Sequence, residues 1–255
     1  MLGITIEYIN IFILVFARIG GMIFFNPLLS RRGVPGQMRV ALVLGMTFLL
    51  VPLLQTGAVA GLSGFPLIFA LAAELFAGLC FGLLFQFYYF MLFFIGVVID
   101  MGFGLSMAKA FDPGTSMQVS LSGNFFQLMF SVFFFLANCH LIFIRLIFST
   151  YDLVGIGGFT FGADIASFIV AQFVAAFGLI MSLALPFIAT AFTLEISMGI
   201  LMKLIPQISI FTIHFQLKVL MGMSLLFLFA VPTSNFIQNY INEIFIQMQN
   251  LLRAF

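Results

Sequence analysis

Hydrophobic residues run along this chain in long, nearly uninterrupted stretches, separated by short polar or glycine-rich connections. The apolar stretches cover residues 8–29, 40–54, 65–111, 125–151, 165–204 and 208–231. A stretch of about twenty apolar residues is long enough to cross the hydrocarbon core of a bilayer as a helix. The pattern therefore predicts an all-α integral membrane protein, with about six long, kinked apolar helices arranged as helical hairpins in one membrane domain, 1–255.

The third stretch leaves the number of spans open at six or seven. A single helix over residues 65–106 would be about 60 Å long, roughly twice the hydrocarbon thickness. Either it folds back as two spans, or it is one long helix that bends and leaves the bilayer. Arg31, Arg32 and Arg39 mark the first loop as cytoplasmic by the positive-inside rule. Lys203 falls on the same side only with six spans, which favours six.

The last residues of the chain have a different pattern. Their apolar residues recur at helical spacing opposite asparagines and glutamines: Ile237, Ile241, Ile244, Phe245, Met248 and Leu251. This spacing predicts an amphipathic C-terminal helix that lies on a membrane or on a partner.

Composition supports the membrane class and excludes several others. Only 7% of the residues are charged and the mean hydropathy is +1.27, which no soluble globular protein shows. The net charge of +1 gives no indication of nucleic acid as a partner. Cys80 and Cys139 lie in separate apolar stretches, which favours two small buried side chains over a disulfide or a metal site.

Five charged residues fall inside or at the margins of the apolar stretches: Arg18, Glu74, Arg145, Glu195 and Lys218. A charge that faces lipid at the centre of a span costs about 2.5–3.5 kcal/mol on insertion scales. We therefore expect these side chains to face protein, water or one another. They are either packing partners and snorkelling end residues, or part of a polar seam or water-filled path shared with other subunits.

Signals of catalysis are poor. His140 and His214 lie far apart and belong to no HExxH or comparable pattern, and neither a nucleophile elbow nor a phosphate-binding loop is present. The sequence thus predicts no enzyme, no cofactor, and no catalytic or metal site.

The connection 102–124 is unusual for a loop between two apolar stretches. It contains four glycines, Gly102, Gly104, Gly114 and Gly123, which can serve as hinges. It also holds large apolar residues, Met107, Phe111 and Met117. From the residues alone it is either an ordinary extramembrane loop or a segment that closes a constriction.

Three segments resemble the FliR family, the integral export-gate subunits of flagellar type III secretion and of its virulence-system relatives. They are RIGGMIFFNPLLSRRGVPGQMRVALVL from Arg18, DMGFGLSMAKAFDPGTS from Asp100, and EISMGILMKLIPQISIFTIHFQLKVLMG from Glu195. Ser209 and Gln216 depart from the family pattern, in which Asn and Pro are expected. The resemblance covers essentially the whole chain.

The resemblance implies a structural and transport role, in the flagellar form rather than the virulence form. Such a subunit joins FliP-like and FliQ-like membrane proteins, with FlhB-like and FlhA-like components nearby, in a channel for unfolded proteins. It implies a FliP-like part, 1–151, and a FliQ-like hairpin with the C-terminal helix, 165–255. It also implies a location in the bacterial inner membrane, within the flagellar basal body.

The resemblance also assigns roles to particular residues. The loop 102–124 would plug the pore, with Phe111 on the axis beside Met107 and Met117. Glu195, Lys203 and Lys218 would be inter-subunit or hairpin-bracing charges. The alternative function is a stand-alone transporter or channel for a small solute, with Glu74, Arg145 and Glu195 along its path.

Overall fold

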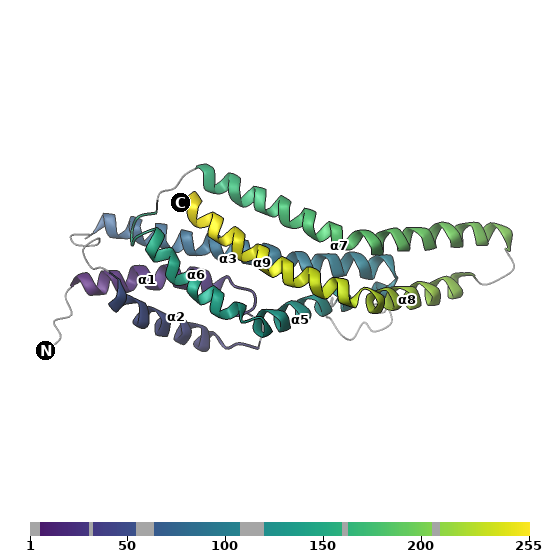
Figure 1. The fold of residues 1–255 in the computed structure, drawn as a ribbon, viewed down its shortest axis with the longest axis horizontal. Coiled ribbons are helices and arrows are strands. Elements are labelled where there is room, and N and C mark those ends of the chain that lie inside the picture. The colour runs from purple at the N-terminus through teal and green to yellow at the C-terminus, as the bar shows by residue number, and fades with distance from the viewer. Residues whose placement is uncertain (1–5, 31–32, 55–63, 108–119, 160–162, 206–209) are drawn as a thin grey trace. The chain divides into compact units, whose positions relative to one another are not determined.

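The computed structural model describes residues 6–30, 33–54, 64–107, 120–159, 163–205 and 210–255, and these residues contain helices and turns but no strand. The α-helices are α1 (Ile6–Phe24), α2 (Gly36–Leu50), α3 (Phe65–Gly102), α5 (Leu121–Leu136), α6 (Cys139–Leu153), α7 (Ala163–Leu204), α8 (Ile210–Leu228) and α9 (Ala230–Ala254) (Figure 1). Two short 3-10 helices, η1 (Val51–Leu53) and η3 (Leu105–Met107), follow α2 and α3.

The chain divides into two compact units. The first unit comprises residues 1–88, 135–174 and 242–255, and the second comprises residues 89–134 and 175–241. Helices α3, α5, α7 and α9 contribute residues to both units.

In the first unit, glycines allow α1 and α3 to pack backbone against backbone. A Cβ atom on Gly78 would lie 2.2 Å from the carbonyl oxygen of Arg18, and one on Gly21 would lie 2.8 Å from the carbonyl carbon of Gly78. No side chain fits at such distances. Helix α2 lies beside α1, where Phe12 meets Phe48 edge to face at a ring-centroid distance of 5.1 Å (Figure 1).

In the second unit, glycines likewise allow α3 and α5 to pack backbone against backbone. A Cβ atom on Gly96 would lie 2.1 Å from the backbone nitrogen of Gly123. Helix α7 continues through Pro186, and the hydroxyl of Thr190 donates a hydrogen bond of 2.8 Å to the Pro186 carbonyl oxygen. Proline at position 186 has no N–H to donate to the carbonyl four residues earlier, while the Thr190 bond is the usual back-bond of a helical threonine to the carbonyl four residues before it.

The helices are those of an integral membrane protein. Four are long and apolar enough to cross a membrane, with candidate spans at Glu7–Phe24, Gly36–Leu53, Phe65–Gly102 and Asp164–Leu204. Two bent helix pairs, α5 with α6 and α8 with α9, raise the number to as many as six. Residues 65–102 form one long helix rather than a hairpin of two, which removes the seven-span alternative.

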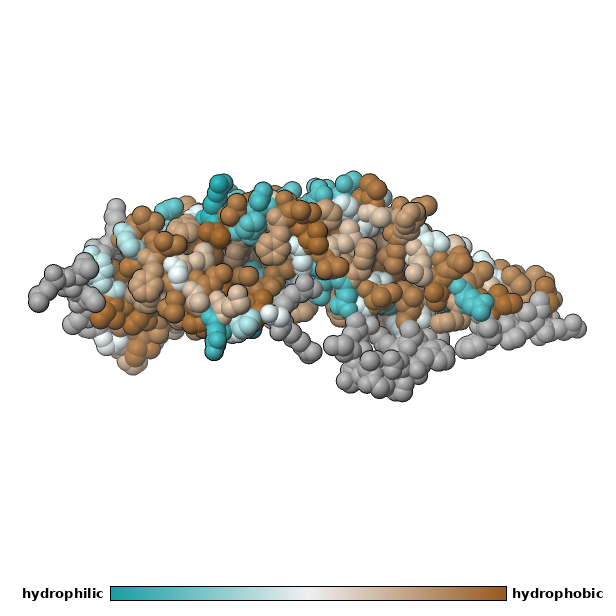
Figure 2. Space-filling view, turned by 90° about the horizontal axis from the view of Figure 1, so that it is seen from below, coloured by the Kyte–Doolittle hydropathy of each residue, from teal (hydrophilic) through white to brown (hydrophobic). Residues whose placement is uncertain are grey.

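Large apolar side chains remain on the surface of the chain. Phe48 and Phe192 are each 67% exposed, and Phe227 is 86% exposed. Hydrophobic residues, coloured brown, cover most of the face shown in Figure 2. Such a surface is stable only against lipid or other protein.

Two expectations from the sequence need correction. The apolar stretch 125–151 is broken between α5 and α6, where Asn138 adopts a left-handed backbone with φ of 55°. Asparagine tolerates this conformation better than most residues. The predicted apolar face of the amphipathic helix α9 is buried within the chain itself and does not lie on a membrane or a partner; its members are Ile237, Ile241, Ile244, Phe245, Met248 and Leu251.

The glycine contacts predict a difference between two alanine substitutions. Gly78→Ala forces α1 and α3 apart and should lower the free energy of unfolding by about 1–3 kcal/mol or more. Gly178→Ala is the control, because that glycine is also helical but has open space around its Cβ position. The control should be neutral or stabilising by up to about 1 kcal/mol. Unfolding in detergent measures both, and equal effects would contradict the close packing.

Candidate functional site

A buried ion pair forms the polar centre of the first unit. Arg18 of α1 and Glu74 of α3 are both fully buried, and two parallel hydrogen bonds join them. Arg18 Nε donates to Glu74 Oε2 at 2.5 Å, and Arg18 Nη2 donates to Oε1 at 2.9 Å. This fork geometry is the strongest form of an arginine–carboxylate pair.

The remaining donors of Arg18 bind the end of α6 and the residues after it. Arg18 Nη1 donates to the carbonyl oxygens of Thr150 at 3.0 Å and Val154 at 3.1 Å, and Nη2 donates to that of Gly155 at 3.2 Å. The guanidinium lies between the rings of Tyr151 and Phe159, with centroid distances of 4.0 and 4.2 Å. All five guanidinium donors are therefore satisfied, which a buried arginine requires.

Glu74 is equally well bound. Besides Arg18, its Oε1 accepts a hydrogen bond of 2.7 Å from the backbone nitrogen of Gly157. The ion pair thus ties α1, α3, α6 and the segment 154–157 together. Its closed geometry suits a structural clamp rather than a path for ions.

A second buried carboxylate, Asp100 of α3, lies at the base of the connection 102–124. Asp100 Oδ2 accepts a hydrogen bond of 2.6 Å from the hydroxyl of Ser120, and Oδ1 accepts one of 3.2 Å from the backbone nitrogen of Ser122. Ser120 also caps α5, because its Oγ accepts a bond of 2.9 Å from the nitrogen of Gly123. A carboxylate at this position also suits the positive end of the α5 dipole.

These contacts hold the two ends of the connection together. We call Gly96, Asp100, Ser120, Ser122 and Gly123 the neck. Residues 102–107 leave it and residue 120 returns to it, so the segment between them begins and ends at one place.

The predicted hinge glycines and plug residues lie at different places in the structure. Gly102 ends α3, Gly104 has a φ of 72°, which favours glycine, and Gly123 lies inside the tightly packed start of α5. Met107 ends η3. Phe111, Gly114 and Met117 lie outside the described residues.

Of the three charges proposed as braces, two meet. Lys218 of α8 donates to Glu195 Oε1 of α7, across the α7–α8 hairpin. His214 adds a third group, with its Nε2 at 3.6 Å from Glu195 Oε2. Lys203 lies in the last turn of α7 and forms no ion pair with any described residue.

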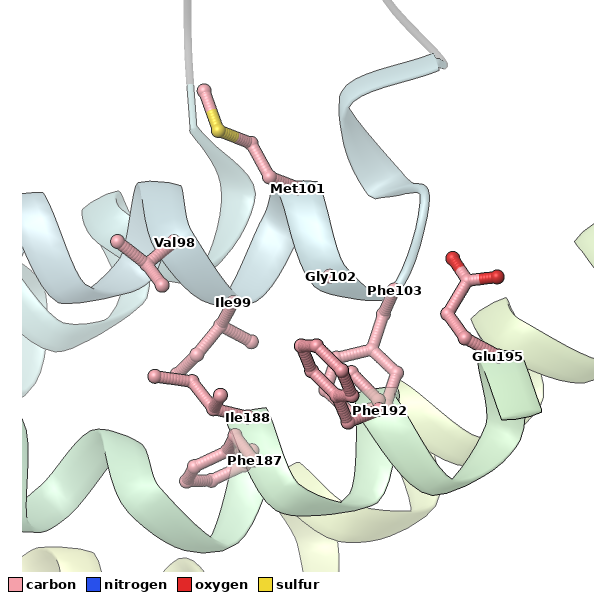
Figure 3. A pocket seen from close by; sticks show the side chains of 10 residues that line it. Val98, Ile99, Met101, Gly102, Phe103, Phe187, Ile188, Phe192 and Glu195 are labelled. Carbon is pink, nitrogen blue, oxygen red and sulfur yellow. The ribbon is translucent and has the colours of Figure 1, made fainter.

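An apolar cleft of about 290 Å³ opens beside this charge cluster (Figure 3). Helix α3 and the residue after it contribute Ile99 and Phe103, and α7 contributes Phe187 and Phe192. Glu195 lies at the edge of the cleft. Gly222 of α8 packs on Phe103, because a Cβ atom there would lie 2.7 Å from the Phe103 Cβ. The start of the connection 102–124 is thus packed against the hairpin.

Several of these contacts were not anticipated from the sequence. Ser120 precedes an apolar stretch, which is the usual signal of a helix cap, and could have been identified. His214 and Lys218 are four residues apart on one helix and so share a face. Asp100 has no such local signal. Among the described residues, no group of three or more His, Cys, Asp or Glu side chains could hold a metal ion.

Comparison with known proteins agrees with this all-α membrane architecture. Residues 9–244 match the family described as bacterial export proteins, family 1. The chain belongs to this family.

Individual relatives extend over nearly the whole chain. The flagellar biosynthetic protein FliR of Escherichia coli K12 is 29% identical over 96% of this chain and 95% of its own length. The protein of the same name from Bacillus subtilis 168 is 25% identical over 97% and 96%, respectively. That of Caulobacter vibrioides is 26% identical over 84% and 85%.

The buried ion pair predicts an asymmetric mutant cycle. Arg18→Met leaves Glu74 buried without its counter-charge and should cost about 3–5 kcal/mol of unfolding free energy. The double variant Arg18→Met/Glu74→Leu removes both charges and should recover a large part of that loss. Denaturant titration in detergent measures the cycle. Strictly additive losses would contradict a direct pair.

The neck predicts different effects at two neighbouring serines. Ser120→Ala removes the bond to Asp100 and the cap of α5, and should cost about 1–3 kcal/mol. Ser122→Ala is the matched control, because the buried Ser122 Oγ has no hydrogen-bond partner among the described residues and only the backbone nitrogen binds Asp100. Ser122→Ala should be neutral or slightly stabilising. A larger loss at Ser122 than at Ser120 would refute the neck.

Proposed function

We propose that this chain is a core membrane subunit of the flagellar type III protein-export gate. The observation that carries the proposal is the family match over residues 9–244, together with relatives named flagellar biosynthetic protein FliR that align over nearly the full length. The proposed role is to build and close a channel for unfolded flagellar proteins. No catalytic step and no cofactor belong to it.

The proposed partners are FliP-like and FliQ-like membrane subunits, with FlhB-like and FlhA-like export components beside them. In this proposal residues 1–151 form a FliP-like part and residues 165–255 a FliQ-like hairpin with a C-terminal helix. The exposed apolar side chains of α2, α7 and α8 support an assembly, because these surfaces need a covering. The proposed location is the bacterial inner membrane, in the flagellar basal body.

The connection 102–124 is the proposed plug of the channel. Phe111, with Met107 and Met117, would fill the constriction, because large apolar side chains exclude water and ions. Methionine is flexible and can seal irregular gaps around different substrates. The neck supports this role, since a segment that closes a pore needs a fixed base.

The hinge glycines and the bracing charges complete the proposal. Gly102, Gly104, Gly114 and Gly123 would let the plug move aside. Glu195 and Lys218 would brace the α7–α8 hairpin, while Lys203 would remain available to a neighbouring subunit. Because α8 packs on Phe103, movement of the hairpin would reach the base of the plug.

The alternative of a stand-alone solute transporter has less support. It requires Glu74 along an aqueous path, but this carboxylate is fully buried and bound by Arg18 and by the nitrogen of Gly157. The same contacts suit a subunit whose clamp holds helices in place.

If the connection 102–124 plugs the channel, removing its large apolar side chains should make the membrane permeable. Replacing Met107, Phe111 and Met117 together by alanine should preserve assembly and secretion but make the membrane permeable to small ions and solutes. Solute uptake in cells that carry the assembled variant, together with secretion of flagellar proteins, measures both effects. The control is alanine at Leu128 and Val132, which are exposed apolar residues of α5 outside the connection.

Unchanged permeability in a variant shown to assemble would contradict the plug while leaving the gate intact. Loss of the gene without loss of secretion would contradict the function itself.

A further inference from the structure

Arg145 is a charged residue in the middle of α6, and the outward side chains next to it are apolar. It lies six residues after the start of α6 and eight before its end, or about 9 Å and 12 Å along the axis. Its side chain is exposed. The neighbouring outward side chains are Leu141, Ile142 and Ile144, which are 47%, 38% and 38% exposed.

The direction in which Arg145 points is fixed by the clamp in the first unit. The opposite face of α6 is buried through Phe143, Leu146, Ile147, Thr150 and Tyr151. Thr150 accepts a bond from Arg18, and the Tyr151 hydroxyl donates one of 3.2 Å to the Val15 carbonyl oxygen. Because these contacts prevent α6 from rotating, Arg145 stays on the outside.

No described carboxylate forms an ion pair with Arg145. Glu74, Asp100 and Glu195 are bound elsewhere, as described above. Asp112 is the one acidic residue of the chain that lies outside the described residues.

Arg145 differs in its position along the helix from the other exposed cations among the described residues. Lys203 and Arg253 lie in the last turns of α7 and α9, where a cation suits the helix dipole and reaches water or headgroups. Arg145 has an apolar turn on either side. A guanidinium in such a place needs an anion that approaches the middle of the helix.

We infer that the outer face of α6 is an interface for a membrane helix of another subunit that presents a carboxylate to Arg145. A carboxylate matches the planar fork of the guanidinium with two hydrogen bonds. A lipid phosphate shares this chemistry but lies at helix ends rather than near the middle. This inference rests on the proposed function in one respect, because the other subunit is assumed to be a component of the export gate.

Asp152 is a second charged group on the proposed interface. It is exposed and lies seven residues after Arg145, two turns along the same side of α6. The partner helix is therefore expected to carry a carboxylate opposite Arg145 and a hydrogen-bond donor about 10 Å further along.

The test uses the full chain, expressed alone and together with the FliP-like and FliQ-like subunits of the same organism. Arg145→Leu should leave the amount of chain in the membrane unchanged when it is expressed alone, but lower the recovered complex at least tenfold. Arg145→Lys should retain part of the recovery, because it keeps the charge without the fork. Arg253→Leu is the control and should have no effect on recovery.

A photo-crosslinking residue at Ile142 identifies what covers the face. A cross-link to a partner subunit, with rescue of Arg145→Glu by a basic residue at the acid found there, is the expected result. Cross-links only to lipid, or only to a second copy of this chain, would overturn the inference. The same holds if Asp112→Asn reproduces the loss, since the carboxylate would then lie within the chain.

The outcomes also separate this inference from the proposed function. If all Arg145 variants assemble like the natural chain, the inferred α6 interface is wrong, while the proposed export-gate function is unaffected. If the natural chain forms no complex with those subunits, the proposed function fails, and the inference fails with it.

Discussion

The hydrogen bonds of Arg18 are the interaction on which the first unit depends. A buried guanidinium is tolerated only when every donor has an acceptor, and here Glu74 and three backbone carbonyls supply them. These acceptors come from α3, from the end of α6 and from residues 154–155. Satisfying one charge therefore fixes the mutual placement of three helices, and it also determines which face of α6 points outward. Gly21 and Gly78 permit the close approach of α1 and α3 that brings the ion pair together.

In the second unit, too, a buried charged group is satisfied by hydrogen bonds from neighbouring helices. Asp100 is buried, and its oxygens are satisfied by a hydroxyl and a backbone nitrogen at the start of α5. Gly96 and Gly123 again allow the backbones to approach. These contacts fix the neck from which the connection leaves. A fixed base of this kind is what the proposed plug requires, because the surrounding helices must stay in place when substrate passes.

The sequence predicted the class of fold, because long apolar stretches and few charges permit little else. It also predicted that charges inside those stretches would face protein, water or one another; Arg18 pairs with Glu74 and Glu195 with Lys218, whereas Arg145 is exposed. It could not predict which charges pair, since Arg18 and Glu74 are 56 residues apart in the chain. The break at Asn138 was missed because the residues on both sides are equally apolar. The burial of α9 was missed because an amphipathic pattern identifies an apolar face but not what covers it.

We propose that this chain works as one part of a larger membrane assembly. The first experiment is native mass spectrometry after gentle solubilisation, with the chain co-expressed with its FliP-like and FliQ-like neighbours. We expect a complex with one copy of this chain and several copies of each smaller subunit. A monomer or a homo-oligomer, with both neighbours verified in the same membranes, would contradict the proposed assembly and favour an ordinary loop for the connection 102–124.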